Sequence, residues 1–242
     1  MKRFYIPEEE FNENNIVLSG VEHNHLKNVL RLKVGEQVIV VCGDGYDYVC
    51  EIDDIDKNFT RLNLVERTQN IYDSHSDVTF FQAMTKSDNM SLIIQKLTEL
   101  GINTFYPFES TFITAKDKAG KSDKLQAISN QSIKQCKRST PMKVMPALKF
   151  NDMVKKLAEF DVVIFANECE KSVNLDEIRL GSGQKVAIIV GSEGGFSADE
   201  IEKITTAGAH SVSLGKRILR AETAAIGLAS VVMFLLGEWR YE

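Results

Sequence analysis

From residue 73 onward the sequence alternates between short apolar runs and helix-like segments, and this alternation limits the fold more than any other feature. The runs "VTFFQAM", "TFYPF", "DVVIFANE" and "KVAIIV" are rich in β-branched and aromatic residues, as buried strands are. Helical segments separate them, among them "KSDNMSLIIQKLTELG" and the basic "KSDKLQAISNQSIKQCKRS". Repeated β-α alternation predicts an α/β domain whose mostly parallel sheet carries helices on both faces.

Residues 1–72 show a different pattern, typical of a small β-rich domain. The segment "EQVIVVCGDGYDYVCEIDDI" contains two apolar-alternating runs joined by Gly43-Asp44-Gly45, which predicts a hairpin. The run "TRLNLVE" adds another strand. We therefore expect two domains, at residues 1–72 and 73–242.

Charge is distributed unevenly along the chain. The total is ordinary for a globular protein, with 26% charged residues and a net charge of −5, and it gives no sign of a nucleic-acid partner. Residues 114–149, however, hold 9 Lys/Arg against 2 Asp/Glu, whereas residues 1–72 hold 8 against 13. The basic stretch predicts either a polyanion-binding surface or a plain solvated helix face.

Metal binding and membrane insertion are not expected. The cysteines Cys42, Cys50, Cys136 and Cys169 form no C-x-x-C pair, and His23 and His25 have no further ligand nearby, so we expect reduced thiols and no metal. The start "MKRFYIPEEEF" lacks a signal-peptide core, which favours a cytoplasmic protein. The uncharged 14-residue run "AAIGLASVVMFLLG" falls short of the roughly 20 residues that span a bilayer. It predicts a helix in a core or in a subunit interface.

A glycine-rich loop, "VGSEGGFSADE", follows the strand-like "KVAIIV" and opens a helix with Ser197 as the predicted N-cap. It matches neither the Walker pattern, which needs a lysine, nor the Rossmann fingerprint. Glu193 would also compete with a pyrophosphate for the positive end of the helix. The loop therefore predicts a ligand other than a polyphosphate, or else a structural turn.

A second loop, "LGKRILRAETA", likewise leaves a strand, with Gly215 at the exit, and enters a helix near Ala221 to Thr223. Loops at the carboxyl ends of neighbouring strands form the ligand sites of open α/β sheets. We expect the backbones of both loops to hydrogen-bond a nucleoside and Ile218 and Leu219 to supply apolar walls. Arg217 and Arg220 add positive charge suited to a docked nucleic acid.

The two loops together resemble the cofactor-site pair of the SPOUT methyltransferases, and the whole chain resembles the RsmE family. "HLKNVLRLKVGE" is similar to a motif of the family's PUA-like RNA-binding barrel. "KSDNMSLIIQKLTELG" resembles its K-x-x-x-M…Q-K-x-x-E-L-G segment, and "QCKRSTP" its Q-[SC]-G-R-x-x-x-P stretch. The resemblance implies an amino-terminal PUA-like barrel and a carboxy-terminal SPOUT α/β domain tied in a trefoil knot.

The resemblance also implies an activity. It predicts methylation of N3 of one uridine in the decoding region of 16S ribosomal RNA, with S-adenosylmethionine (SAM) as cofactor and a homodimer joined through the knotted domain. Three alternatives stay open. They are a SPOUT enzyme that methylates ribose 2′-O or another base of rRNA or tRNA, a non-catalytic RNA-binding module, and, more distantly, a dinucleotide oxidoreductase.

The resemblance further implies site residues. The expected cofactor contacts are Phe165, Ala166, Asn167, Gly191, Ser192, Glu193, Gly194, Gly195, Leu214, Gly215, Ile218, Leu219, Arg220, Thr223 and Ala224. The expected RNA contacts are Arg3, Lys27, Arg31, Lys33, Lys86, Lys134, Gln135, Lys137 and Arg138. Arg220 is the candidate catalytic residue, as a stabiliser of the uridine anion; alternatively it pairs with Glu222 or Glu193. No residue stands out as the general base.

Three positions depart from the family pattern. Ser192 replaces the proline of the usual G-P-E-G-G loop, and Lys137 stands where the family usually has glycine. Phe112 stands where the family usually has the arginine of S-E-R, which puts one expected RNA or substrate contact in doubt.

Overall fold

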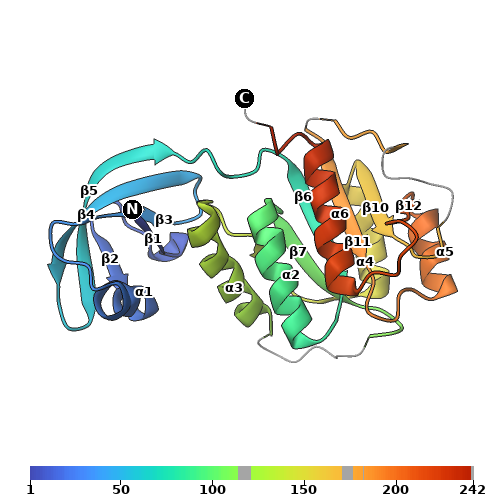
Figure 1. Cartoon of the computed structure of the whole chain (residues 1–242), viewed down its shortest axis with the longest axis horizontal. Helices are drawn as coiled ribbons and strands as arrows, with labels where there is room; N and C mark the ends of the chain where they lie inside the picture. Colours follow the sequence, from blue (N-terminus) through green and yellow to red (C-terminus); the bar gives the residue numbers. More distant parts are fainter. Residues whose placement is uncertain (114–120, 171–176, 182, 241–242) are drawn as a thin grey trace. The chain divides into compact units, whose positions relative to one another are not determined.

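The computed structural model describes residues 1–113, 121–170, 177–181 and 183–240 (Figure 1). It divides into two compact units. The first comprises Met1–Asp73 together with Asn130–Pro141, and the second comprises Ser74–Ser129 and Met142–Glu242. A segment from the middle of the chain thus packs with the amino-terminal residues.

The first unit is built on a five-stranded sheet of order β1-β3-β4-β5-β2. The predicted hairpin is confirmed: β3 (Gln37–Val41) and β4 (Tyr46–Ile55) pair antiparallel on either side of Gly43 and Gly45, whose φ angles are 97° and 87°. β5 (Phe59–Gln69) is the further strand expected from "TRLNLVE". β2 (Ile16–Ser19) pairs antiparallel with β5, and β1 (Lys2–Tyr5) runs parallel to β3. The short helix α1 (Gly20–Asn24) continues into a π-helical turn at His25–Leu30.

Asp73 ties the segment Asn130–Pro141 into the first unit. Its carboxylate accepts hydrogen bonds from the backbone N–H groups of Ser139 and Thr140, and it forms an ion pair with Arg138. The amide of Asn70 donates to the backbone carbonyl of Lys137 over 2.9 Å. These bonds satisfy backbone polar groups of residues 137–140. The carboxyl end of α3 (Lys121–Cys136) is therefore held by residues far from it in sequence.

The second unit holds a parallel sheet of order β12-β10-β11-β6-β7-β8, with β9 also pairing β7. The order of its strands places β10 between β11 and β12. The strands are β6 (Asp77–Ala83), β7 (Thr104–Glu109), β8 (Lys143–Val144), β9 (Leu148–Lys149), β10 (Val162–Ala166), β11 (Lys185–Val190) and β12 (His210–Val212). The predicted mostly parallel sheet is confirmed.

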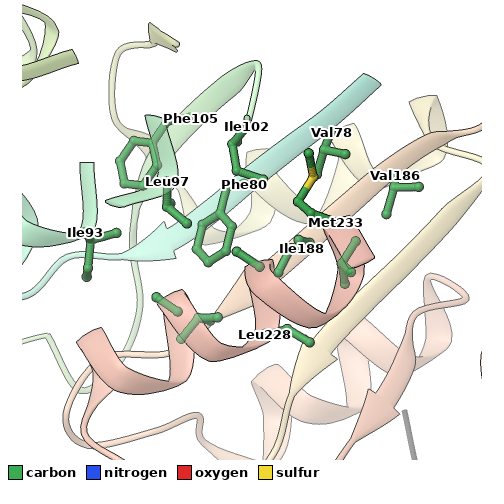
Figure 2. Close-up of a cluster of buried hydrophobic side chains, with 14 of the residues drawn as sticks. Val78, Phe80, Ile93, Leu97, Ile102, Phe105, Val186, Ile188, Leu228 and Met233 are labelled. Carbon is green, nitrogen blue, oxygen red and sulfur yellow. The ribbon is translucent and has the colours of Figure 1, made fainter. Parts of the chain in front are cut away.

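Helices cover both faces of this sheet, as the alternation predicted. On one face α2 (Ser87–Leu100) and α6 (Ala221–Leu235) pack on residues such as Phe80 and Ile188, and Figure 2 shows this core with Leu97 and Leu228. On the other face lie α4 (Phe150–Lys156) and α5 (Ala198–Thr206). Neighbouring residues of one strand alternate between the two cores, because successive side chains of a strand point to opposite faces. The α6 segment that raised the question of a membrane is therefore partly core, and no helix in the described part of the chain is long and apolar enough to cross a bilayer.

Candidate functional site

The loops that follow β10, β11 and β12 line a cavity of about 550 Å³ at the carboxyl edge of the sheet. The two loops singled out from the sequence follow β11 and β12. The sequence interpretation took these two strands as immediate neighbours in the sheet, which is wrong, because β10 lies between them. A third loop, beginning at Asn167 after β10, consequently joins the lining. Asn167 connects two of the three strand ends, since its N–H donates to the carbonyl of Val212 over 2.9 Å.

The glycine-rich loop after β11 is a tight turn held by hydrogen bonds within its own backbone and from a side chain of β6. The N–H of Gly195 donates to the carbonyl of Ser192 over 3.0 Å, and the buried amide of Gln82 on β6 donates to the carbonyl of Gly191 over 2.9 Å. Gly195 has a φ of 67°, and a Cβ there would lie 2.8 Å from a carboxylate oxygen of Glu168. The positive φ favours glycine here, and a larger residue would have to displace the Glu168 carboxylate of the loop that follows β10.

The helix after this loop begins as predicted. The Ser197 hydroxyl accepts from the N–H of Glu200, and the Glu200 carboxylate accepts from the N–H of Ser197, which completes a capping box. The cap fixes the point where the loop ends and α5 starts.

The second loop presents its side chains to the cavity and to solvent. Gly215 turns the chain with a φ of 96°, and its N–H donates a hydrogen bond to the Ser213 hydroxyl oxygen over 3.2 Å. Ile218 is 92% exposed although it is apolar, so it offers a wall that a ligand would cover. Arg220 is the N-cap of α6, without a side-chain capping bond, and its side chain is exposed beside the cavity.

Most of the expected cofactor contacts lie together in this lining, and three do not. Phe165 is fully buried in the core under α5 and packs edge-on against Phe196. Gly194 lies against Phe112, and Thr223 is exposed one residue beyond the lining residue Glu222. The members in the lining are Ala166, Asn167, Gly191, Ser192, Glu193, Gly195, Leu214, Gly215, Ile218, Leu219, Arg220 and Ala224.

Sequence reasoning missed several lining residues. Glu168 and Cys169 lie in the lining because they directly follow β10, so their position at a strand end was the available signal. Phe196 belongs to the glycine-rich motif itself. It lines the cavity and also packs against the hydrophobic core.

Charges of both signs surround the cavity. Lys86, Arg217 and Arg220 bring positive charge, whereas Glu193 and Glu222 bring carboxylates. Glu193 accepts a hydrogen bond from Asn89 over 3.2 Å. One carboxylate oxygen of Glu222 is buried and finds no hydrogen-bond partner among the described residues. A buried acceptor without a partner is costly, so this oxygen suits a donor supplied by a ligand.

The alternative in which Arg220 pairs with a carboxylate is not what the structure shows. Within the described ranges, no ion pair joins Arg220 to Glu222 or to Glu193. Its guanidinium is exposed at the cavity and is available to a substrate.

The expected RNA contacts separate into paired and exposed side chains. Arg3 is bound by Asp47 in a two-bond ion pair, Lys134 pairs with Glu22 over 2.7 Å, and Arg138 is 3% exposed beside Asp73. Each of these three pairs with an acidic residue distant in sequence, a partner that the sequence interpretation did not foresee, and their contact with RNA stays a prediction. Lys27 donates to the carbonyl of Asp56, and the exposed members are Arg31, Lys33, Lys86, Gln135 and Lys137.

No group of three or more His, Cys, Asp or Glu side chains placed to hold a metal ion occurs among the described residues.

Comparison with known proteins identifies the class. The RNA methyltransferase domain family matches residues 73–233, and the RNA methyltransferase PUA domain family matches residues 18–64. The fold and these matches define the chain as an RNA methyltransferase-domain protein with a PUA domain.

The relatives narrow the family. A Rickettsia conorii ribosomal RNA small subunit methyltransferase E is 33% identical over 238 residues, covering 96% of this chain and 95% of the relative. Its Bacillus subtilis counterpart is 29% identical over 229 residues, covering 90% and 89%. The chain belongs to the ribosomal RNA small subunit methyltransferase E family, which confirms the resemblance carried by the two loops.

Solved structures agree with this assignment. The Neisseria gonorrhoeae ribosomal RNA small subunit methyltransferase E, solved bound to S-adenosyl methionine, superposes with a TM-score of 0.89 at 26% identity over 98% of each chain. A Legionella pneumophila protein solved in complex with the cofactor SAM superposes with a TM-score of 0.87 at 26% identity over 96% of each chain.

Proposed function

We propose that this protein transfers a methyl group from SAM to N3 of a uridine in 16S ribosomal RNA. The observation that carries the proposal is the cavity of about 550 Å³ formed by three loops at the carboxyl edge of the sheet. Two of these three loops carry the motifs on which the family resemblance rests. The names of the relatives and the SAM-bound structures of two of them support the substrate and the cofactor.

The residues of the cavity fit SAM. Backbone amides and carbonyls of residues 191–195 and 214–219 are suited to the edge of a nucleoside, and Leu214 and Leu219 line it with apolar surface. The unpartnered oxygen of Glu222 suits a hydroxyl or ammonium donor of the cofactor. When bound, SAM supplies an electrophilic methyl group on a cationic sulfonium.

Arg220 is proposed to prepare the uridine. N3 of uridine carries a proton and is a poor nucleophile until that proton leaves, which places negative charge on O2, N3 and O4. An exposed guanidinium at the cavity rim donates hydrogen bonds to such oxygens and stabilises the anion more than the neutral base. The free side chain of Arg220 meets this requirement.

RNA binding is proposed to rest on the exposed cations of each unit. Arg31, Lys33 and Lys137 in the first unit and Lys86 in the second are placed to contact phosphates, which would position the RNA without reading its sequence. An rRNA substrate would place the enzyme in the cytoplasm.

A homodimer through α6 is proposed from the exposed face of that helix. Gly227, Val231 and Phe234 recur at helical spacing on this face, Phe234 is 57% exposed, and Trp239 beyond the helix is 54% exposed. Such an apolar face is typical of a protein interface. We expect Phe234→Glu to convert a dimer into a monomer in light scattering; an unchanged mass would contradict the proposal. The trefoil knot stays a prediction.

The test of the proposed function is transfer of labelled methyl. The protein is incubated with methyl-labelled SAM and with either free 16S rRNA or small ribosomal subunits, both taken from cells that lack this protein. The RNA is then digested to nucleosides. Label in 3-methyluridine supports the proposal. Label in a 2′-O-methyl nucleoside or another base favours a different specificity, and no transfer to any RNA favours a binding module.

A further inference from the structure

The turn at Ser110–Ile113 is anchored at two points to the glycine-rich loop and the helix that follows it. The N–H of Thr111 donates to Glu200 over 2.8 Å, and the carbonyl of Phe112 accepts a hydrogen bond from the Ser192 hydroxyl over 2.9 Å. Glu200 is 3% exposed and belongs to the capping box of α5, so it is itself held in place. The backbone of this turn is therefore fixed to the wall of the proposed cofactor cavity.

The turn also packs closely against that loop. A Cβ on Gly194 would lie 2.7 Å from the Cβ of Phe112, so only glycine allows this approach. Despite these contacts, the side chain of Phe112 is 47% exposed. Phe112 therefore combines a backbone held by two hydrogen bonds with an aromatic ring that leaves about half of its surface open to a ligand.

The two residues that depart from the family pattern here, Ser192 and Phe112, are thus joined by a hydrogen bond. Ser192 stands in the place of the loop proline and Phe112 in the place of the arginine of S-E-R. A proline has no hydroxyl with which to hold the carbonyl of residue 112. The pair replaces an expected charged contact with an aromatic ring that is tied to the loop.

We propose that Phe112 is a stacking platform for an unpaired base of the RNA, next to the uridine that enters the cavity. This inference rests on the proposed function. Aromatic side chains bind single-stranded RNA by stacking on base faces, and this binding tolerates any base. Ser192, which lines the cavity, acts as a positioning residue that holds the backbone of Phe112 against the glycine-rich loop.

The experiment compares four variants of the full-length protein at saturating SAM. Phe112→Ala removes the ring, Phe112→Leu keeps apolar bulk without a π face, Phe112→Tyr keeps the ring, and Phe112→Arg restores the family's charge. We expect kcat/KM for RNA to fall roughly 5- to 100-fold in the alanine and leucine variants and to stay near wild type in the tyrosine variant. Affinity for SAM and thermal stability are expected to stay unchanged in all four.

Salt dependence separates stacking from charge. The slope of log affinity against log salt concentration is expected to be that of wild type in Phe112→Ala and to steepen by about one unit or less in Phe112→Arg, because only the latter adds a phosphate contact. The inference is overturned if Phe112→Ala or Phe112→Leu matches wild type on RNA, or if the loss follows weaker SAM binding or lower stability. A wild-type protein that methylates no RNA contradicts the proposed function instead, whatever the variants do.

Discussion

Replacing Gly195 by alanine tests whether the glycine-rich loop is a ligand cradle or only a turn. Gly195 has a φ of 67°, a conformation that costs an L-residue about 1–2 kcal/mol. The new methyl group would also lie 2.8 Å from the Glu168 carboxylate in the wall of the cavity. That carboxylate is the end of a flexible side chain, so it can move aside, and its displacement alters the wall of the cavity rather than the core. We therefore expect Gly195→Ala to lower the free energy of unfolding by about 1–2 kcal/mol and to weaken SAM binding by about tenfold, roughly 1.4 kcal/mol.

Gly208→Ala is the matched control. Gly208 has a φ of 88° in the turn after α5, nothing lies within 4 Å of a Cβ there, and it is outside the cavity lining. It should lose similar stability but bind SAM as wild type does. Both quantities are measured directly, by denaturant unfolding and by titration calorimetry. The reasoning is refuted if Gly195→Ala binds SAM with wild-type affinity, or if both variants lose affinity equally.

Four further predictions concern side chains whose environments differ. Arg220→Ala is expected to lower kcat by about 100-fold or more while the SAM dissociation constant stays within about twofold; an equal loss of SAM affinity in calorimetry would reject its role in anion stabilisation. Lys137→Gly should weaken RNA binding and lower its salt slope by about one without loss of stability, because residue 137 has a φ of 70° that glycine adopts freely. Arg138→Ala should instead destabilise the protein by about 1–3 kcal/mol, since Asp73 loses its ion pair with this buried guanidinium but keeps its hydrogen bonds from Ser139 and Thr140; a fully stable variant with weak RNA binding would reverse this assignment. Cys169, exposed in the cavity lining, should react with a thiol reagent at pH 8 and be protected by SAM, whereas burial raises the pKa of Cys50 to about 12 and keeps that thiol protonated and unreactive. Equal labelling of Cys169 with and without SAM would place the ligand elsewhere.

Local sequence patterns were sufficient to predict the main strands and helices and the positions of the two loops. The β-branched runs predicted β10 and β11, the Gly43-Asp44-Gly45 turn predicted the first hairpin, and Ser197 is the N-cap that its position before "ADE" indicated. These features depend on neighbours in sequence, which periodicity and turn chemistry report well.

Pairings between distant residues were not accessible from the sequence. Nothing local shows that Arg138 meets Asp73 across 65 positions, or that residues 130–141 pack with the first unit. The order β12-β10-β11 likewise depends on the whole sheet, and it added Glu168 and Cys169 to the site. The anchoring of Phe112 by Ser192 joins two residues that the sequence marked only as separate departures.

Primer extension on 16S rRNA tests the central claim most directly, because a methyl group on N3 of uridine removes the hydrogen of its Watson–Crick edge and blocks copying. RNA from cells lacking the protein is treated with enzyme and SAM and then copied. The account predicts one new stop at a uridine, dependent on SAM and reduced with the Gly195→Ala enzyme. Identical stops with and without the wild-type enzyme, on both free RNA and small subunits, would contradict it.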